Sequence, residues 1–144
     1  MFIILLVVAG GTLLSTTTNA ATITTLFGGS WEVGGIWDTG NPPIATDDVV
    51  ISSGNNVTLT SNVTVASLAV NSEDLTVFTI NSGYTLTVTG DVTIYGSVDA
   101  TSSQIACNGN IVIGGNLIFN GDASNAQAQL SMGDGSTASL SGNI

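Results

Sequence analysis

The chain of 144 residues contains no lysine, no arginine and no histidine, against ten aspartate and glutamate residues, so its net charge is −10. Nucleic-acid binding needs cationic side chains that neutralise phosphates. Attraction to anionic lipid headgroups needs the same side chains. The sequence therefore excludes nucleic acids and anionic membrane surfaces as partners.

The same absences remove most enzyme chemistry. Without histidine there is no imidazole base, and without lysine or arginine no cationic group stabilises an oxyanion. The adjacent pairs Asp47–Asp48 and Glu73–Asp74 point to opposite faces if they lie on strands. The remaining aspartates are scattered along the chain. We therefore predict that this chain holds no catalytic site.

A single cysteine, Cys107, rules out an internal disulfide. It lies in "QIACNG", among residues typical of a strand. Free cysteine is among the most buried residue types. We expect a small core residue here, with an exposed or intermolecular thiol as the alternative.

Helical periodicity is absent after residue 21. Apolar residues alternate with Thr, Ser and Asn, and β-branched residues dominate. Gly, Asn, Asp and Ser cluster between these runs. Alternation indicates half-buried strands, and the clusters are typical of turns. The sequence predicts an all-β fold.

Residues 1–20 differ from the rest. The apolar run Phe2–Ala9 is followed by small and polar residues that end at Ala20, with Thr18 and Ala20 at the −3 and −1 positions of a cleavage site. This pattern predicts a secretory signal peptide over 1–20, although the usual basic residue before the apolar run is absent. A membrane anchor is the alternative, but the apolar run is far shorter than the ~20 residues of a span.

Four similar stretches follow: "GNNVTLTSNVTV", "GYTLTVTGDVTI", "GNIVIGGNLIF" and "GSTASLSGNI". Their first glycines, Gly54, Gly83, Gly109 and Gly135, are 29, 26 and 26 residues apart. A fixed period of this size with strand-like content predicts a solenoid in which each repeat is one coil. We predict a right-handed parallel β-helix of about three to four coils, with three strands to a coil, over residues 51–144. An antiparallel β-sandwich is the alternative.

Alignment on these glycines places equivalent residues above one another, because coils stack at about 4.8 Å. It predicts two interior columns and one corner column. The first interior column is Leu59, Val88, Ile113 and Leu140, the second is Val63, Val92, Leu117 and Ile144, and the corner holds Asn62, Asp91, Asn116 and Asn143.

Residues 21–50 are predicted to form an N-terminal cap, because the first coil of a solenoid otherwise exposes an apolar end. Trp31, Trp37 and Phe27 are the aromatic side chains available to cover it. The alternative role for Trp31 and Trp37 is a platform on which sugar rings stack.

Two weaker sites are also considered. Glu73, Asp74 and Asp134 are candidate calcium ligands in turns, although ordinary solvated acids are the favoured interpretation. The Thr-x-Thr pairs Thr58/Thr60 and Thr87/Thr89 would order water on a flat face if they stack, as in ice binding. Outward threonine more commonly reflects β-propensity alone. No other cofactor is expected.

The text "SWEVGGIWDTGNPPIATDDVVISSGNNVTL", followed by "VASLAVN" and "FTINSGYTLTVTGDVTI", resembles the N-terminal region of large secreted bacterial β-helix proteins. Many of these are Bacteroidetes proteins exported by type IX secretion, and the resemblance covers roughly residues 29–119. It implies an adhesin-like or structural solenoid, extracellular or on the cell surface. Independently of the resemblance, the outward Thr, Ser and Asn residues predict a polar outer face that would contact extracellular polysaccharides or surface glycans through shape and hydrogen bonds. The alternative is the non-catalytic leading segment of a β-helix carbohydrate-active enzyme. The end of the chain inside the fourth repeat further leads us to expect a truncated solenoid that self-associates edge to edge.

Overall fold

A computed structural model of the chain describes residues 20–144 except 72–73, 97–102 and 122–126. The predicted signal peptide falls almost wholly outside the described residues. Apart from a single turn of 3-10 helix, η1 (Gly34–Ile36), the regular elements are β-strands. In the described part of the chain, no helix is long and apolar enough to span a bilayer.

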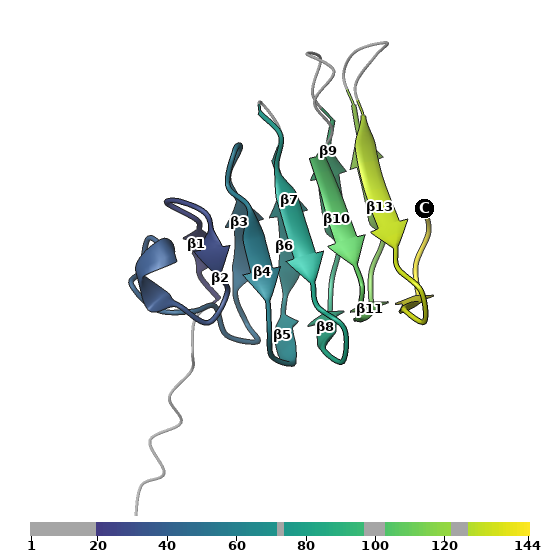
Figure 1. Cartoon of the computed structure of the whole chain (residues 1–144), viewed down its shortest axis with the longest axis horizontal. Coiled ribbons are helices and arrows are strands. Elements are labelled where there is room, and N and C mark those ends of the chain that lie inside the picture. The colour runs from purple at the N-terminus through teal and green to yellow at the C-terminus, as the bar shows by residue number, and fades with distance from the viewer. Residues whose placement is uncertain (1–19, 72–73, 97–102, 122–126) are drawn as a thin grey trace, which may run out of the picture.

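The strands wind into a parallel β-solenoid of about four turns, drawn with its coils side by side along the long axis (Figure 1). Three sheets run along this axis, and every strand-to-strand ladder within them is parallel. The first sheet contains β1 (Thr22–Thr24), β3 (Asp48–Ile51), β6 (Ser67–Val70), β9 (Val92–Tyr95) and β12 (Leu117–Asn120). The second contains β2 (Gly29–Ser30), β4 (Val57–Leu59), β7 (Val77–Ile80), β10 (Ser103–Cys107) and β13 (Ala128–Met132). The third contains β5 (Val63–Val65), β8 (Thr85–Val88), β11 (Asn110–Ile113) and β14 (Thr137–Leu140).

Each coil contributes one strand to each sheet, so β3, β4 and β5 form the first complete coil and β12, β13 and β14 the last. This confirms the predicted all-β parallel solenoid with three strands per coil. The antiparallel sandwich is wrong, because the only antiparallel contact between described strand-like segments is an isolated bridge in the cap. The sense of winding stays a prediction from the general handedness of parallel crossovers.

The core is a set of aliphatic columns that run the length of the solenoid. A single coil cannot bury its inward side chains, whereas stacked coils bury them against equivalent residues above and below. Three of the columns are Val49–Leu68–Val92–Leu117, Leu59–Ile80–Cys107–Met132 and Val65–Val88–Ile113–Leu140. Their members in the middle coils have essentially no exposed surface.

The columns correct the predicted alignment of the first repeat. Leu59 pairs with Ile80 in the second sheet, not with Val88, whose partner in the first coil is Val65. Val63 likewise pairs with Leu86 instead of lying in the Val92 column. The stretch that begins at Gly54 starts in the turn between β3 and β4, whereas the other three stretches start one turn later in their coils, before β8, β11 and β14. The prediction was wrong because the sequence alternates in the same way after both turns.

The corner column is correct for three of its four members. The backbone N–H of Asn116 donates to Asp91 Oδ1 at 2.6 Å, and that of Asn143 donates to Asn116 Oδ1 at 3.0 Å. Asn62 lies in a different ladder, because its Oδ1 accepts the backbone N–H of Thr85 at 2.8 Å. A side chain that bonds the coil above stabilises a bend, since it satisfies the amide that the turn leaves open.

Candidate functional site

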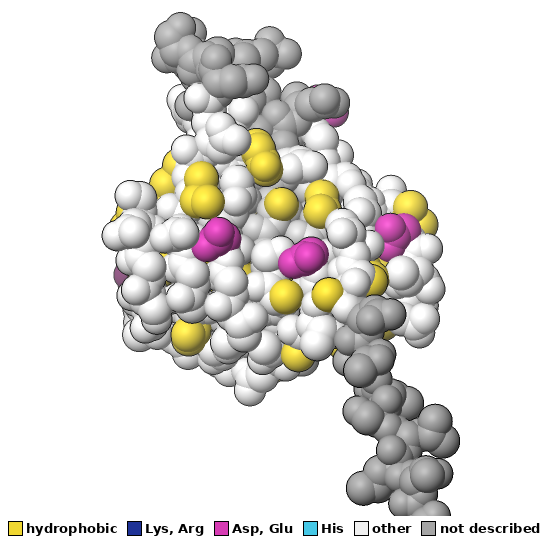
Figure 2. All heavy atoms as spheres, turned by 180° about the vertical axis from the view of Figure 1, so that it is seen from behind, with side chains coloured by type: hydrophobic (Ala, Val, Ile, Leu, Met, Phe, Trp, Pro, Cys, Tyr) yellow, Lys and Arg dark blue, Asp and Glu magenta, His cyan; other side chains and the backbone are white. Residues whose placement is uncertain are grey.

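The acidic side chains that the structure describes lie almost entirely in turns and in the N-terminal cap. Within the fourteen described strands, Asp48 in β3 is the only charged residue. Figure 2 shows one long face of the solenoid, where acidic side chains stand apart from one another among uncharged polar and scattered apolar ones. Apart from Asp48, the described strands therefore present uncharged faces.

The β5–β8–β11–β14 face is the most open of them. Its outward column is Thr64–Thr87–Val112–Ser139, in which only Thr87 is partly buried. A second ladder of polar side chains runs beside it, in which Thr137 Oγ1 donates to Asn110 Oδ1 at 2.7 Å. Hydroxyl and amide groups thus repeat along this face at the coil spacing of about 4.8 Å.

The Thr-x-Thr pairs do not stack on one face. Thr58 lies in β4 and pairs with Thr79, whereas Thr87 lies in β8 and pairs with Thr64. The ice-binding hypothesis rested on the alignment that the register corrects, and these two pairs belong to different sheets.

The two tryptophans are core residues of the cap. Trp31 and Trp37 are each 1% exposed, and their rings meet edge to face at a centroid distance of 4.9 Å. Trp37 Nε1 donates to the Trp31 carbonyl at 2.8 Å, which satisfies the indole N–H inside the core. Such burial fits capping and leaves no ring face on which a sugar can stack. Phe27, the third aromatic predicted to cover this end, is instead 54% exposed.

Glu32 joins the cap to the first coil. Its carboxylate accepts the backbone N–H of Thr60 and the hydroxyl of Ser61, both at 2.8 Å, together with the hydroxyl of Ser30. Burial raises the pKa of Glu32, but these hydrogen bonds outweigh it and lower the pKa from 4.5 to about 2. The charged carboxylate is therefore the form that holds the cap in place.

We expect Glu32→Gln to lower the free energy of unfolding near neutral pH by about 1 kcal/mol, because the carboxylate is largely exposed and solvent screens it. The folded-state pKa of about 2 lies below the unfolded value of 4.5, so the stabilisation is complete above pH 4.5 and is lost as the pH falls toward 2. Chemical denaturation over this pH range measures it. Asp134→Asn, which removes the same charge from an exposed turn, controls for the change in net charge. If the difference in unfolding free energy between the wild type and Glu32→Gln did not change with pH, this role of Glu32 would be contradicted.

The other acidic candidates have structural partners or lie outside the described residues. Asp47 is 5% exposed, and its carboxylate accepts the backbone N–H groups of Ile44 and Ala21. Glu73 lies outside the described residues. Asp74 and Asp134 lie exposed in separate turns, and among the described residues no three Asp, Glu, Cys or His side chains gather closely enough to hold a metal ion.

Cys107 is buried, as predicted. It continues the Leu59–Ile80 column, and burial raises the pKa of its thiol. A thiol held protonated in an apolar column is a poor nucleophile and metal ligand. Cys107 is therefore a packing residue.

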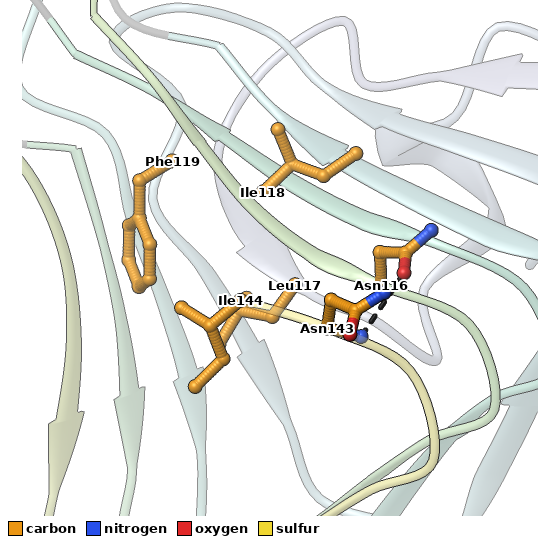
Figure 3. A pocket seen from close by; sticks show the side chains of 6 residues that line it. All are labelled: Asn116, Leu117, Ile118, Phe119, Asn143 and Ile144. Atoms are coloured by element: carbon orange, nitrogen blue, oxygen red, sulfur yellow. Dashed lines mark hydrogen bonds between the residues drawn. The ribbon is translucent and has the colours of Figure 1, made fainter.

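A groove of about 350 Å³ lies at the C-terminal end of the solenoid, beside β12. Figure 3 shows its lining: Leu117, Ile118, Phe119 and Ile144 along the apolar part, and Asn116 and Asn143 at the polar part, where they are hydrogen-bonded. Sequence reasoning missed this groove, because its lining combines residues that are distant in the sequence. The signal that it did contain was the run of apolar residues "LIF" in the last coil.

Comparison with protein-family models, with curated proteins and with solved structures found no match to this chain.

Proposed function

We propose that this chain is a structural or adhesive module that works outside the cell or on the cell surface, and that its β5–β8–β11–β14 face contacts neutral glycans. The β-solenoid fits such a module in general. The observation that supports the proposal most directly is the open column Thr64–Thr87–Val112–Ser139 on strands without charge. Three of its four side chains, those of Thr64, Thr87 and Ser139, present hydroxyl groups that can bond the hydroxyl groups of an extended polysaccharide, and Val112 adds an apolar contact between them.

Charge narrows the ligand class. The chain has a net charge of −10 and no basic side chain. It therefore repels anionic polysaccharides, such as those that carry uronic acids or sulfate groups. Neutral glycans meet no such penalty, since they bind through hydrogen bonds and shape. The proposed partner is therefore an uncharged extracellular or cell-surface polysaccharide.

Two features of the sequence support a location outside the cell or on the cell surface. Residues 1–20 have the pattern of a secretory signal, and residues 29–119 resemble the leading part of secreted bacterial β-helix proteins of the Bacteroidetes type. Export by type IX secretion belongs to the same proposal. The alternative role, as the leading segment of a carbohydrate-active enzyme, stays a prediction.

Binding to an array of neutral glycans, followed by calorimetry on the best ligand, tests the proposal. We expect the double substitution Thr64→Val and Thr87→Val to weaken affinity about tenfold, because it removes two hydroxyl groups that each contribute about 0.5–1.5 kcal/mol as hydrogen bonds. Thr58→Val with Thr79→Val is the matched control, since this pair is also stacked in register but lies on the second sheet.

An equal loss of affinity in both double variants would show that the β5–β8–β11–β14 face is not the binding surface. Absence of binding to every neutral glycan would remove the adhesive role and leave the structural one.

A further inference from the structure

Asp47 is a buried carboxylate at the junction of the cap and the first coil. It is 5% exposed, its Oδ2 accepts the backbone N–H of Ile44 at 2.9 Å, and its Oδ1 accepts that of Ala21 at 3.3 Å. Its backbone carbonyl also accepts the N–H of Ala66 at 2.9 Å. A buried carboxylate is costly unless a cation balances it. Because the sequence contains no Lys, Arg or His, the only cation that it can place against Asp47 is a free α-amino group.

Ala21 is held in one position beside this carboxylate. Its carbonyl accepts the backbone N–H of Asp48 at 2.8 Å. β1 begins at the next residue and pairs in parallel with β3, starting with Thr22 opposite Asp48 (Figure 1). All of these contacts lie on the C-terminal side of the Ala21 nitrogen. The sheet therefore places that nitrogen next to Asp47 without any contribution from the residue before it.

The bond between Ala20 and Ala21 is also the one at which the sequence predicts signal-peptide cleavage, with Thr18 and Ala20 at the −3 and −1 positions. Both alanines are exposed. Hydrolysis breaks this C–N bond, adds the hydroxyl of water to the Ala20 carbonyl carbon and leaves an amine on Ala21. The amine takes up a proton at pH 7, because the pKa of an α-amino group is about 7.7–8.0. The sequence pattern and the hydrogen bonds thus converge on the same nitrogen atom.

We propose, on the basis of the location proposed above, that cleavage after Ala20 by a signal peptidase creates a structural cation, the α-ammonium group of Ala21, which pairs with Asp47 and fastens the cap to the first coil. An ammonium group has three N–H donors where the amide has one, so the existing bond is kept and a charge is added. Hydrogen bonds between ionised groups are shorter and stronger than neutral ones. Because Ala21 is exposed, the ammonium keeps contact with water. The cleaved chain is therefore the more stable form.

Cutting the folded full chain at a defined bond tests the proposal. One version carries the recognition site of an endoprotease ending at residue 20, so that cutting leaves Ala21 first. A second version carries the site one residue earlier, so that cutting leaves Ala20 first. Both products have one α-ammonium group, placed one residue, or about 3.8 Å, apart. We expect urea denaturation to give an equilibrium constant for folding about tenfold larger for the product that begins with Ala21.

Two substitutions show whether Asp47 is the partner. Asp47→Asn should abolish the difference between the two cut products, because a neutral amide forms no ion pair with the ammonium group. Asp38→Asn is the matched control, since the Asp38 carboxylate also accepts a backbone N–H of β1, that of Thr24 at 3.1 Å. It removes the same charge from the same region and should leave the difference unchanged.

Acetylation provides a second measurement that needs no substitution at Asp47. Because the sequence contains no lysine, an amine-reactive acetylating reagent modifies only the α-amino group of either cut product and removes its charge. Acetylation of the product that begins with Ala21 restores an amide at that nitrogen, so it should cancel the tenfold gain. The product that begins with Ala20 should change little.

Equal stability of the two cut products, or a gain that survives Asp47→Asn or acetylation, would overturn the proposal. Export of the natural full chain from a bacterial host, followed by its intact mass, should give a product that begins with Ala21, and cleavage at another bond would also overturn it. Failure of export would instead contradict the proposed location, while the comparison of cut products still decides the contact with Asp47. Glycan binding is a separate readout, because neither Ala21 nor Asp47 lies on the β5–β8–β11–β14 face.

Discussion

Trp31→Ala should destabilise the fold by about 3–5 kcal/mol, the usual cost of deleting a large buried aromatic side chain. Trp31 is 1% exposed and lies between the cap and the first coils, with its ring 4.9 Å from Trp37 and 5.5 Å from Phe78, measured between centroids. The backbone N–H of Trp31 also donates to the Thr58 carbonyl of β4 at 2.9 Å. The substitution therefore leaves a cavity where the cap packs on the aliphatic columns.

Urea denaturation followed by far-ultraviolet circular dichroism measures this loss without relying on tryptophan fluorescence. Phe27→Ala is the control, because it truncates an aromatic of the same region that is 54% exposed. We expect it to cost less than about 1 kcal/mol, as surface substitutions do. Equal losses for the two variants would mean that the cap does not pack on Phe78 as described.

The solenoid could be predicted from the sequence because its cause is repetitive. Inward positions such as Val88, Ile113 and Leu140 must be apolar in every coil, since each covers its neighbour, and so the pattern recurs in the sequence. The buried cysteine followed from the same alternation. The position of the cap tryptophans followed from the need to close an apolar end.

The register of the first coil could not be predicted because two corners of a coil have the same local chemistry. Both "VTL" at 57–59 and "VTV" at 63–65 alternate as a strand that precedes or follows a polar turn. Nothing local states whether Leu59 or Val65 lies beneath Val88; the number of residues in each corner decides it, and that number varies between coils. A fixed period is only an approximation for a solenoid with loops of unequal length.

Glu32 was missed for a different reason. In "GSWEV" it is an ordinary exposed acid, and the groups that lower its pKa include the amide of Thr60 and the hydroxyl of Ser61, far along the chain. Electrostatic sites of this kind arise from long-range contacts, which depend on the register. The groove beside β12 is similar, because its lining combines Asn116–Phe119 with Asn143 and Ile144, which are distant in the sequence. The repeated columns of the solenoid could therefore be predicted from the sequence, whereas the Glu32 contacts and the groove, which each occur once, could not.

Gly109→Ala should destabilise the fold by about 3 kcal/mol, through a close approach of two coils and not through backbone strain. A Cβ at this position would overlap the backbone carbonyl oxygens of Tyr84 and Asn81 in the coil below. Those carbonyls belong to the turn around Gly83, and the N–H of Asn110 already bonds Tyr84 at 2.8 Å. Neither oxygen can swing away as a flexible side chain would, so the coils must separate locally.

Substitutions at two other glycines distinguish steric overlap between coils from backbone strain. Gly35→Ala meets nothing within 4 Å and has no positive φ, so it should be neutral or slightly stabilising. Gly83→Ala also enters open space, but its φ of +86° strains an L-residue by about 1–2 kcal/mol. Urea midpoints with unchanged m-values give the order Gly35, Gly83, Gly109 by increasing loss. If Gly109→Ala were as mild as Gly35→Ala, the corners of the second and third coils would not stack in contact, and the column register that places Cys107 on Ile80 would have to be redrawn.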